Sequence, residues 1–154
     1  MLFRLLRLVN APYRNALWVL PVTGFFFICW YLLLDLVFGD GSINFTAPSQ
    51  ILFAGSPATL AEEVYFRGFL LNKFQQITGF WWADLYSALL FGLIHLPEWY
   101  ALGSFSSPLA VADFAGIVAF GLIFRLVMRK TGSLWFAYLV HALNNLFAVA
   151  VFGT

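Results

Sequence analysis

The stretch LWVLPVTGFFFICWYLLLDLVF, residues 17–38, decides the fold class of this chain. It is as long and as apolar as the segment of about 20 residues that an α-helix needs to cross a bilayer. The whole chain agrees with this stretch, because 62% of its 154 residues are hydrophobic and only 10% are charged. Soluble domains carry about a quarter charged residues. The composition therefore predicts an integral membrane protein and excludes soluble globular, disordered and nucleic-acid-binding proteins.

Three arginines, Arg4, Arg7 and Arg14, precede this stretch, as basic residues precede the apolar part of a signal peptide. The apolar run is too long for a signal peptide, and no small-x-small cleavage site follows it. We therefore expect a retained helix. Cys29 inside the run is the single cysteine, so neither an intrachain disulfide nor a cysteine-based zinc site can form. We expect Cys29 to be a small buried hydrophobic side chain.

Four further apolar segments follow and are separated by polar turns. They span residues 51–72, 80–96, 108–128 and 133–152. The sequence predicts an all-α, polytopic membrane helix bundle of about five transmembrane helices. Residues 1–50, which contain the basic leader, the first helix and an outer loop, are expected to precede a core of four helices in residues 51–154.

The distribution of positive charge predicts the orientation of this bundle. The loops 39–50 and 98–107 contain no Lys or Arg. The basic residues at segment ends all fall on one side if the chain crosses five times: Arg4, Arg7, Arg14, Lys73, Arg125, Arg129 and Lys130. Positively charged loops stay in the cytoplasm, so we expect a cytoplasmic N-terminus and an outer C-terminus. Asp84 lies near a segment end, where we expect water to solvate it.

The second segment carries three charged residues within six positions: Glu62, Glu63 and Arg67. A charge at the middle of a membrane costs about 3 kcal/mol on insertion scales, so each needs a reason. Glu63 and Arg67 are four residues apart, share a helix face and can form an ion pair. Glu62 lies about 100° around the helix, and that ion pair does not explain it.

Both histidines of the chain, His95 and His141, also lie in predicted spans, and Asn145 shares the face of His141. A single histidine in a membrane helix usually makes an interhelical hydrogen bond. Here two histidines, two glutamates and an asparagine pair (Asn144 and Asn145) all lie at membrane depth. Ionisable groups at that depth are functional by default, so this combination favours one shared site.

The chemistry of this set is that of peptide hydrolysis. A carboxylate and an imidazole can hold and deprotonate water, while a second imidazole and a carboxamide can donate hydrogen bonds to an oxyanion. The chain has no G-x-S-x-G motif, and Cys29 has no histidine near it in sequence, so no rival nucleophile is evident. Alternatively, Glu62, His95 and His141 could bind zinc with water as a fourth ligand, although no H-E-x-x-H motif is present.

Three motifs give the chain a family resemblance. EEVYFRG (62–68) matches E-E-x-x-x-R, FGLIH (91–95) matches F-x-x-x-H, and HALNN (141–145) matches H-x-x-x-N. In this order on successive apolar segments, they resemble the CPBP family of intramembrane proteases, also called the Abi family, which includes the type II CAAX prenyl endopeptidases. Because a single helix precedes the family core, the chain resembles a small prokaryotic member from the cell membrane.

The resemblance implies a glutamic-type protease with four catalytic residues. Glu62 and His95 would activate the water, and His141 and Asn145 would form the oxyanion hole. Glu63 and Arg67 would support the site from the same helix as Glu62. The implied mechanism needs neither a metal nor another cofactor.

The resemblance also implies the partners, which are membrane lipid and a membrane-embedded or membrane-anchored peptide. We expect the substrate to be a C-terminal anchor or sorting tail, or a CAAX-like or bacteriocin-type peptide. Two other functions use the same residues: a non-catalytic immunity or binding protein of the same fold, and a proton or ion pathway. A complete catalytic set with its oxyanion donors favours the enzyme over both.

Overall fold

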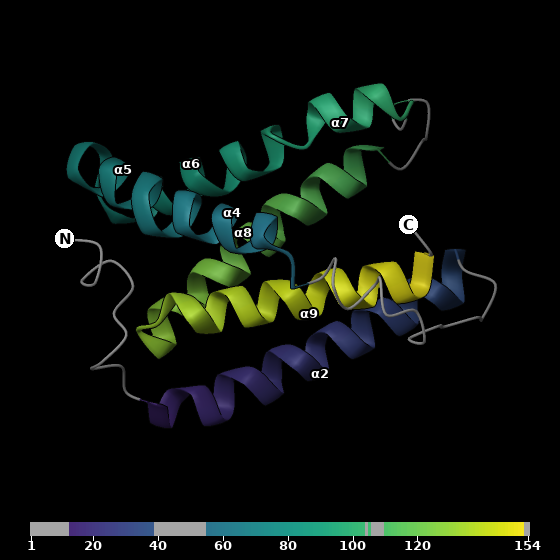
Figure 1. The fold of residues 1–154 in the computed structure, drawn as a ribbon, viewed down its shortest axis with the longest axis horizontal. Coiled ribbons are helices and arrows are strands. Elements are labelled where there is room, and N and C mark those ends of the chain that lie inside the picture. Colours follow the sequence, from purple (N-terminus) through teal and green to yellow (C-terminus); the bar gives the residue numbers. More distant parts are fainter. Residues whose placement is uncertain (1–12, 39–54, 104, 106–109, 153–154) are drawn as a thin grey trace.

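The computed structural model describes residues 13–38, 55–103, 105 and 110–152, and within these ranges the chain is all-α, without a strand (Figure 1). The helices are α2 (Tyr13–Phe38), α4 (Pro57–Glu63), the π-helix η1 (Val64–Leu70), α5 (Leu71–Thr78), α6 (Phe80–Leu93), α7 (Leu96–Ala101), α8 (Ala110–Thr131) and α9 (Leu134–Phe152). The predicted fold class is confirmed. Each of the five predicted segments corresponds to a helix, and the second is a continuous rod made of α4, η1 and α5.

Two of these helices are long and apolar enough to cross a membrane by length and composition, Leu17–Val37 and Ala110–Thr131. The apolar part of α9, Leu134–Ala150, is shorter. The rod of α4, η1 and α5 carries charged residues in its middle, and hydropathy therefore does not identify it as a membrane span. Many large apolar side chains of α2 and α8 point outward, which suits helices that contact lipid.

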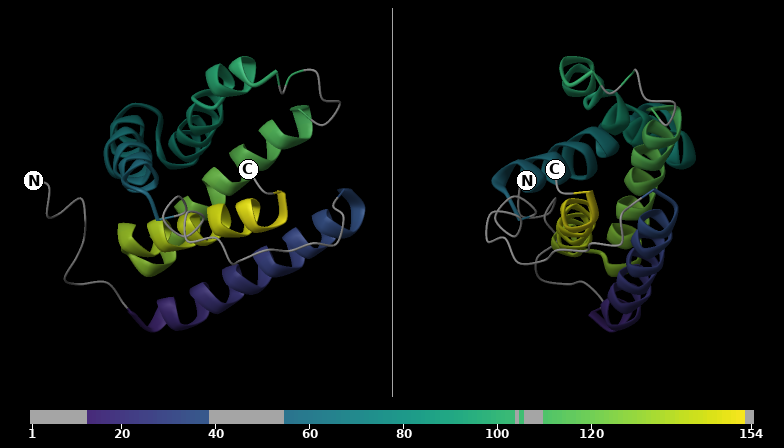
Figure 2. Two further views of the ribbon diagram at one scale, coloured as in Figure 1. Left: turned by 45° about the vertical axis from the view of Figure 1, so that its right-hand side comes forward. Right: turned by 90° about the vertical axis from the view of Figure 1, so that its right-hand side faces the viewer.

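Helix α2, the rod of α4, η1 and α5, then α6, α8 and α9 run in alternating directions, and α7 continues the direction of α6 (Figure 1). Helices α2 and α9 lie side by side and point the same way (Figures 1 and 2). The start of α2, the junction of α5 with α6, and the junction of α8 with α9 therefore lie at one end of the bundle. Lys73, Arg129 and Lys130 belong to this end. Gly132, with φ of +68°, makes the turn between α8 and α9, a backbone conformation that favours glycine.

Two glycines let α6 and α8 approach each other closely. A Cβ on Gly92 would lie 2.9 Å from Val118 Cγ2 on α8. A Cβ on Gly121 would lie 3.2 Å from the Cβ of Ala88 and 3.3 Å from its Cα. Small residues at helix contacts are the usual means by which membrane helices pack tightly, so these two positions fix the spacing of α6 and α8.

Helix α6 ends at Leu93, three residues earlier than the predicted segment 80–96. Pro97 explains this end, because it has no N–H for the carbonyl of Leu93 and its ring would clash with that carbonyl. The chain resumes as the short helix α7, where residues 98–101 were expected to be loop. His95 therefore lies at a turn between two helices rather than inside one.

Two expectations for single residues are wrong. Asp84 is buried rather than solvated, and its Oδ1 accepts a 2.7 Å hydrogen bond from Nε of Arg125 on α8. Cys29 is exposed rather than buried. It lies two residues from the buried Phe27 and Tyr31, and an α-helix turns by about 100° per residue, so Cys29 points away from the core.

The glycine contacts predict opposite effects for two alanine substitutions on α8. Gly121→Ala should lower the free energy of unfolding by about 1–3 kcal/mol, because its Cβ would press on Ala88. Gly116→Ala is the control, since nothing lies within 4 Å of its Cβ, and it should raise stability by up to about 1 kcal/mol. Unfolding in mixed micelles measures both, and equal effects of the two changes would contradict the packing.

Candidate active site

The buried carboxylate of Glu63 lies at the centre of the predicted site. Its side chain is 0% exposed, and its Oε1 lies 2.9 Å from Arg67 Nη1 and 2.8 Å from His141 Nδ1. The ion pair with Arg67, predicted from the spacing of four residues, is confirmed. The contact with His141 was not predicted, and it connects the E-E-x-x-x-R motif directly to the H-x-x-x-N motif on α9.

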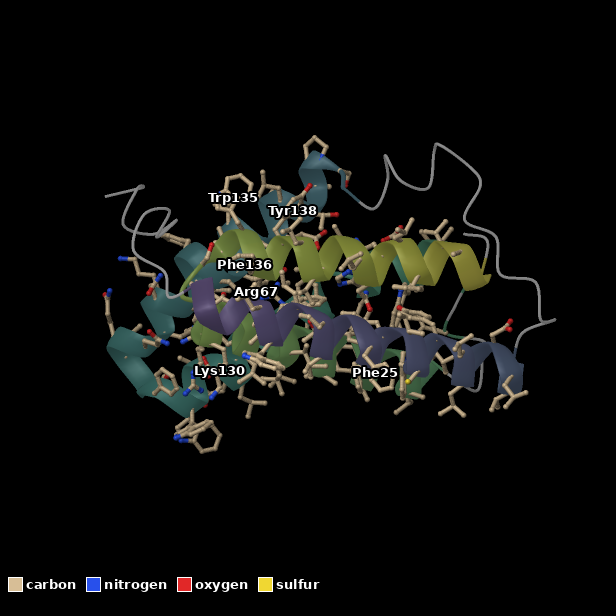
Figure 3. All side chains as sticks on the ribbon, turned by 90° about the horizontal axis from the view of Figure 1, so that it is seen from below. Phe25, Arg67, Lys130, Trp135, Phe136 and Tyr138 are labelled. Atoms are coloured by element: carbon tan, nitrogen blue, oxygen red, sulfur yellow. The ribbon has the colours of Figure 1, made fainter. Side chains whose placement is uncertain are left out.

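Arg67, labelled in Figure 3, is held on several sides in the interior of the bundle. Its Nη2 donates a 3.3 Å hydrogen bond to the carbonyl oxygen of Gly121 on α8. The guanidinium carbon lies 4.2 Å from the ring centroid of Phe91 and 5.3 Å from that of Phe124. These cation–π contacts and the hydrogen bond compensate for the loss of water around the charge.

The backbone around Arg67 is a π-helix, η1, rather than an α-helix. The N–H of Leu71 bonds to the carbonyl oxygen of Phe66, five residues earlier, and this oxygen also accepts a 3.0 Å hydrogen bond from Ser87 Oγ on α6. The wider turn buries three consecutive residues, Phe66, Arg67 and Gly68. Single π-helical turns are frequent at functional sites, and here the turn carries the central arginine.

His141 lies between the two adjacent glutamates. Nδ1 faces Glu63, and Nε2 lies 3.8 Å from Oε2 of Glu62. A carboxylate can only accept, so Nδ1 carries the hydrogen and donates it to Glu63. The ring stacks on Phe124 with centroids 4.5 Å apart. The Glu62 side chain is 29% exposed, so its carboxylate is accessible in a way that the Glu63 carboxylate is not.

The turn after α6 fixes the orientation of His95. The backbone N–H of His95 donates to the carbonyl oxygen of Gly92, which leaves the carbonyl of Phe91 without its usual helical partner. Nδ1 of the His95 ring lies 2.8 Å from that oxygen and donates to it, because a carbonyl only accepts. In the neutral ring, Nε2 then holds a lone pair that can take a proton.

Phe91 lies between the two histidines. Its ring makes edge-to-face contacts with His95 at 5.1 Å and with His141 at 5.6 Å between centroids. The imidazole centroids are therefore no further apart than the sum of these distances. Within the described ranges, no hydrogen bond or ion pair joins His95 to Glu62. That these two share one water stays a prediction.

Asn145 is brought to the start of α4. Its Nδ2 donates to Oγ1 of Thr59 at 3.3 Å, and Thr59 lies one helical turn before the two glutamates. Tyr138, one turn before His141 on α9, donates a 2.9 Å hydrogen bond to the carbonyl oxygen of Gly55 just before α4. The polar side chains of Tyr138 and Asn145 on α9 therefore face the beginning of the rod formed by α4, η1 and α5.

The described part of the chain contains no group of three His, Cys, Asp or Glu side chains placed to bind one metal ion together. Glu62, His95 and His141, the alternative zinc ligands, are not arranged as such a group. The Glu62 carboxylate lies beside the imidazole of His141. The imidazole of His95 contacts the Phe91 ring, which also contacts His141.

Helix α8 contributes to the site without carrying any recognisable motif. The carbonyl of Gly121 and the ring of Phe124 hold Arg67 and His141, and neither residue differs in sequence from an ordinary part of an apolar helix. The hydroxyl of Thr59, which accepts from Asn145, likewise belongs to none of the three motifs. In each case the signal is a tertiary contact that spacing along the chain does not reveal.

The family model described as type II CAAX prenyl endopeptidase Rce1-like matches residues 44–147, which is more than half of the chain. This stretch contains all six predicted site residues, whereas α2 lies outside it. No curated protein and no solved structure matches the chain.

The burial of the central ion pair predicts its effect on folding. Glu63→Gln leaves the guanidinium of Arg67 buried without its counter-charge, and it should lower the free energy of unfolding by about 3–5 kcal/mol. Glu62→Gln is the matched control on the neighbouring, partly exposed residue, and it should change stability by less than about 1 kcal/mol. Thermal unfolding of both purified variants tests this, and equal losses would contradict a central role for Glu63.

Proposed function

This chain belongs to the Rce1-like family of type II CAAX prenyl endopeptidases, and we propose that it is a glutamic-type intramembrane endopeptidase. The family is a protease family, and the apolar helices make the protein a membrane protein. Glu62 and His95 activate a water molecule for attack on a peptide carbonyl. His141 and Asn145 stabilise the oxyanion that forms.

The convergence of α4 and α9 is the observation that supports this proposal best. Glu62 and His141 lie 3.8 Å apart at their nearest ring nitrogen and oxygen, and Asn145 bonds to Thr59 one turn away. A partly exposed carboxylate, an imidazole and a carboxamide thus come from two helices into one region. General-base hydrolysis requires this combination of a proton acceptor with oxyanion donors.

The reaction proceeds in two steps without a covalent enzyme intermediate. Water loses a proton to the Glu62–His95 pair while its oxygen bonds to the scissile carbonyl carbon. The carbonyl oxygen becomes an oxyanion that accepts hydrogen bonds from His141 and Asn145. The intermediate then collapses, the C–N bond breaks, and the proton passes from the base to the leaving amine, which restores the enzyme.

Glu63 and Arg67 support this chemistry through His141. Because Nδ1–H of His141 is used on Glu63, Nε2 can donate to an oxyanion only when the ring is an imidazolium. The negative charge of Glu63 stabilises that cation, and Arg67 holds the carboxylate in place. Glu63 and Arg67 are therefore positioning residues, whereas Glu62 and His95 touch the reacting water.

The proposed substrate is a C-terminal tail held at the membrane, of the CAAX, anchor or sorting-tail type. We propose a prokaryotic cell membrane with the N-terminus in the cytoplasm and the C-terminus outside. The orientation is supported by Lys73, Arg129 and Lys130, which belong to the end of the bundle where α2 begins. A tail tethered in the same membrane needs no soluble encounter to reach a site within the bundle.

Proteolysis by the purified protein in bicelles tests the function. The substrates are a farnesylated peptide ending in a CAAX sequence, the same peptide without the lipid, and the same tail fused to a transmembrane anchor. Glu62→Gln should lower kcat by about 100-fold or more while the protein stays folded, because it removes the general base. Asp113→Asn, a carboxylate change at the start of α8, is the control and should leave cleavage unchanged. Cleavage by Glu62→Gln at the wild-type rate would reject the assignment.

The metal-free mechanism makes a separate prediction. Cleavage should continue unchanged after dialysis against EDTA and in the presence of 1,10-phenanthroline, since only side chains activate the water. Elemental analysis of the same samples provides the control. Stoichiometric zinc, together with loss of cleavage on its removal and recovery on its return, would identify a metalloprotease instead.

A further inference from the structure

A chain of hydrogen bonds runs from α2 to the proposed oxyanion donor. The hydroxyl of Tyr31 on α2 donates to Oδ1 of Asn144 at 3.0 Å. Nδ2 of Asn144 donates to Oδ1 of Asn145 at 3.4 Å, and Nδ2 of Asn145 donates to Oγ1 of Thr59 at 3.3 Å. The hydroxyl of Thr59 lies 3.3 Å from Oγ of Ser56, its next polar neighbour.

The three bonds from Tyr31 to Thr59 all have the same direction. Each amide accepts on its oxygen from the α2 side and donates from its nitrogen toward α4. An asparagine amide has two orientations that differ by a 180° flip, and the neighbours decide between them. In Asn145 the orientation shown puts the NH2 group on the side of α4 and its two glutamates. Only one of its two N–H groups is used on Thr59, and the other has no partner among the described residues.

The start of this chain is well buried. Tyr31 is 4% exposed and Asn144 is 9% exposed, so neither can exchange its partner for bulk water. The Tyr31 ring stacks on Phe147 of α9 with centroids 6.0 Å apart, which fixes the hydroxyl independently of its hydrogen bond. Because the Tyr31 hydroxyl donates here, it holds the oxygen of the Asn144 amide toward α2, and a flip of that amide would require the hydroxyl to turn and accept instead.

We propose that Tyr31 is a positioning residue for catalysis, which orients the carboxamide of Asn145 through Asn144 so that an N–H faces the substrate carbonyl. This inference rests on the proposed function of Asn145 as an oxyanion donor. Tyr31 lies outside residues 44–147, which match the family model, so α2 would add to the site a residue that the matched stretch does not include. Helix α2 is therefore more than a membrane anchor.

A double-mutant cycle on the best-cleaved peptide tests the proposal. Asn145→Ala should lower kcat by about 100-fold or more, as the loss of an oxyanion donor does, and Tyr31→Phe should lower kcat by about 10-fold with KM unchanged. In the Asn145→Ala background, Tyr31→Phe should have no further effect on kcat. A merely structural role would lower kcat by the same factor in both backgrounds and would overturn the proposal. Tyr86→Phe on the exposed part of α6 is the control and should leave kcat unchanged.

Thr59 provides a conservative rescue at the other end of the chain. Thr59→Val keeps the shape but removes the acceptor for Asn145, and it should lower kcat about as much as Tyr31→Phe does. Thr59→Ser restores the hydroxyl and should restore kcat. If Thr59→Val has full activity, the hydrogen bond to Asn145 does not orient the amide and the proposal is wrong.

Nuclear magnetic resonance makes the test independent of proteolysis. The side-chain amides of asparagine are labelled with ¹⁵N, and the Asn145 signals are identified by their absence from Asn145→Ala. Tyr31→Phe should shift the NH2 signals of both Asn144 and Asn145, and Tyr86→Phe should not. If the wild type cleaves no peptide, the proposed function fails while these signals still decide the positioning role. Unmoved Asn145 signals in Tyr31→Phe overturn that role and leave the proposed function intact.

Discussion

The structure depends on one carboxylate, that of Glu63, which is charged and fully buried. Removing a carboxylate from water costs several kcal/mol unless cations and donors replace the water. Arg67 from the same rod and His141 from α9 supply these contacts, and both meet the same oxygen. Arg67 in turn requires a carbonyl of α8 and aromatic faces from α6 and α8. The rod, α6, α8 and α9 are therefore arranged around a single charge.

This arrangement gives two adjacent glutamates different environments. Glu63 has no exposed surface, while the side chain of Glu62 is 29% exposed, because adjacent helical residues differ by about 100° in direction. A fully buried carboxylate, with Oε1 already paired with Arg67 and His141, is a poor proton acceptor for an incoming water. A partly exposed one beside an imidazole is a better acceptor. The paired glutamates thus separate a structural task from a chemical one.

Features that depend on residues close together in the sequence can be predicted from it, whereas contacts between residues far apart in the sequence cannot. The helices, the Glu63–Arg67 pair and the different position of Glu62 follow from periodicity and spacing alone. The burial of Asp84 by Arg125 and the hydrogen bond from Tyr31 to Asn144 join residues 41 and 113 positions apart. Hydropathy also predicts that His95 lies within a helix. Pro97 has no N–H for the carbonyl of Leu93, so α6 ends at Leu93 and His95 lies in a turn. Direct contact of Glu62 with His95 is not among the interactions of the described residues, so the pairing inferred from the motifs stays a prediction.

The π-helix η1 has a consequence for how related chains should be compared. A π-helical turn contains more residues than an α-helical turn, and a stretch of this kind can be regarded as an α-helix that has gained a residue. Relatives without that residue would have a regular α-helix here and a chain shortened by one position between Arg67 and Leu71. The spacing from Glu63 to Arg67 cannot shorten in this way, because it sets the ion pair. Alignments should therefore keep the E-E-x-x-x-R spacing rigid and allow a single gap immediately after it.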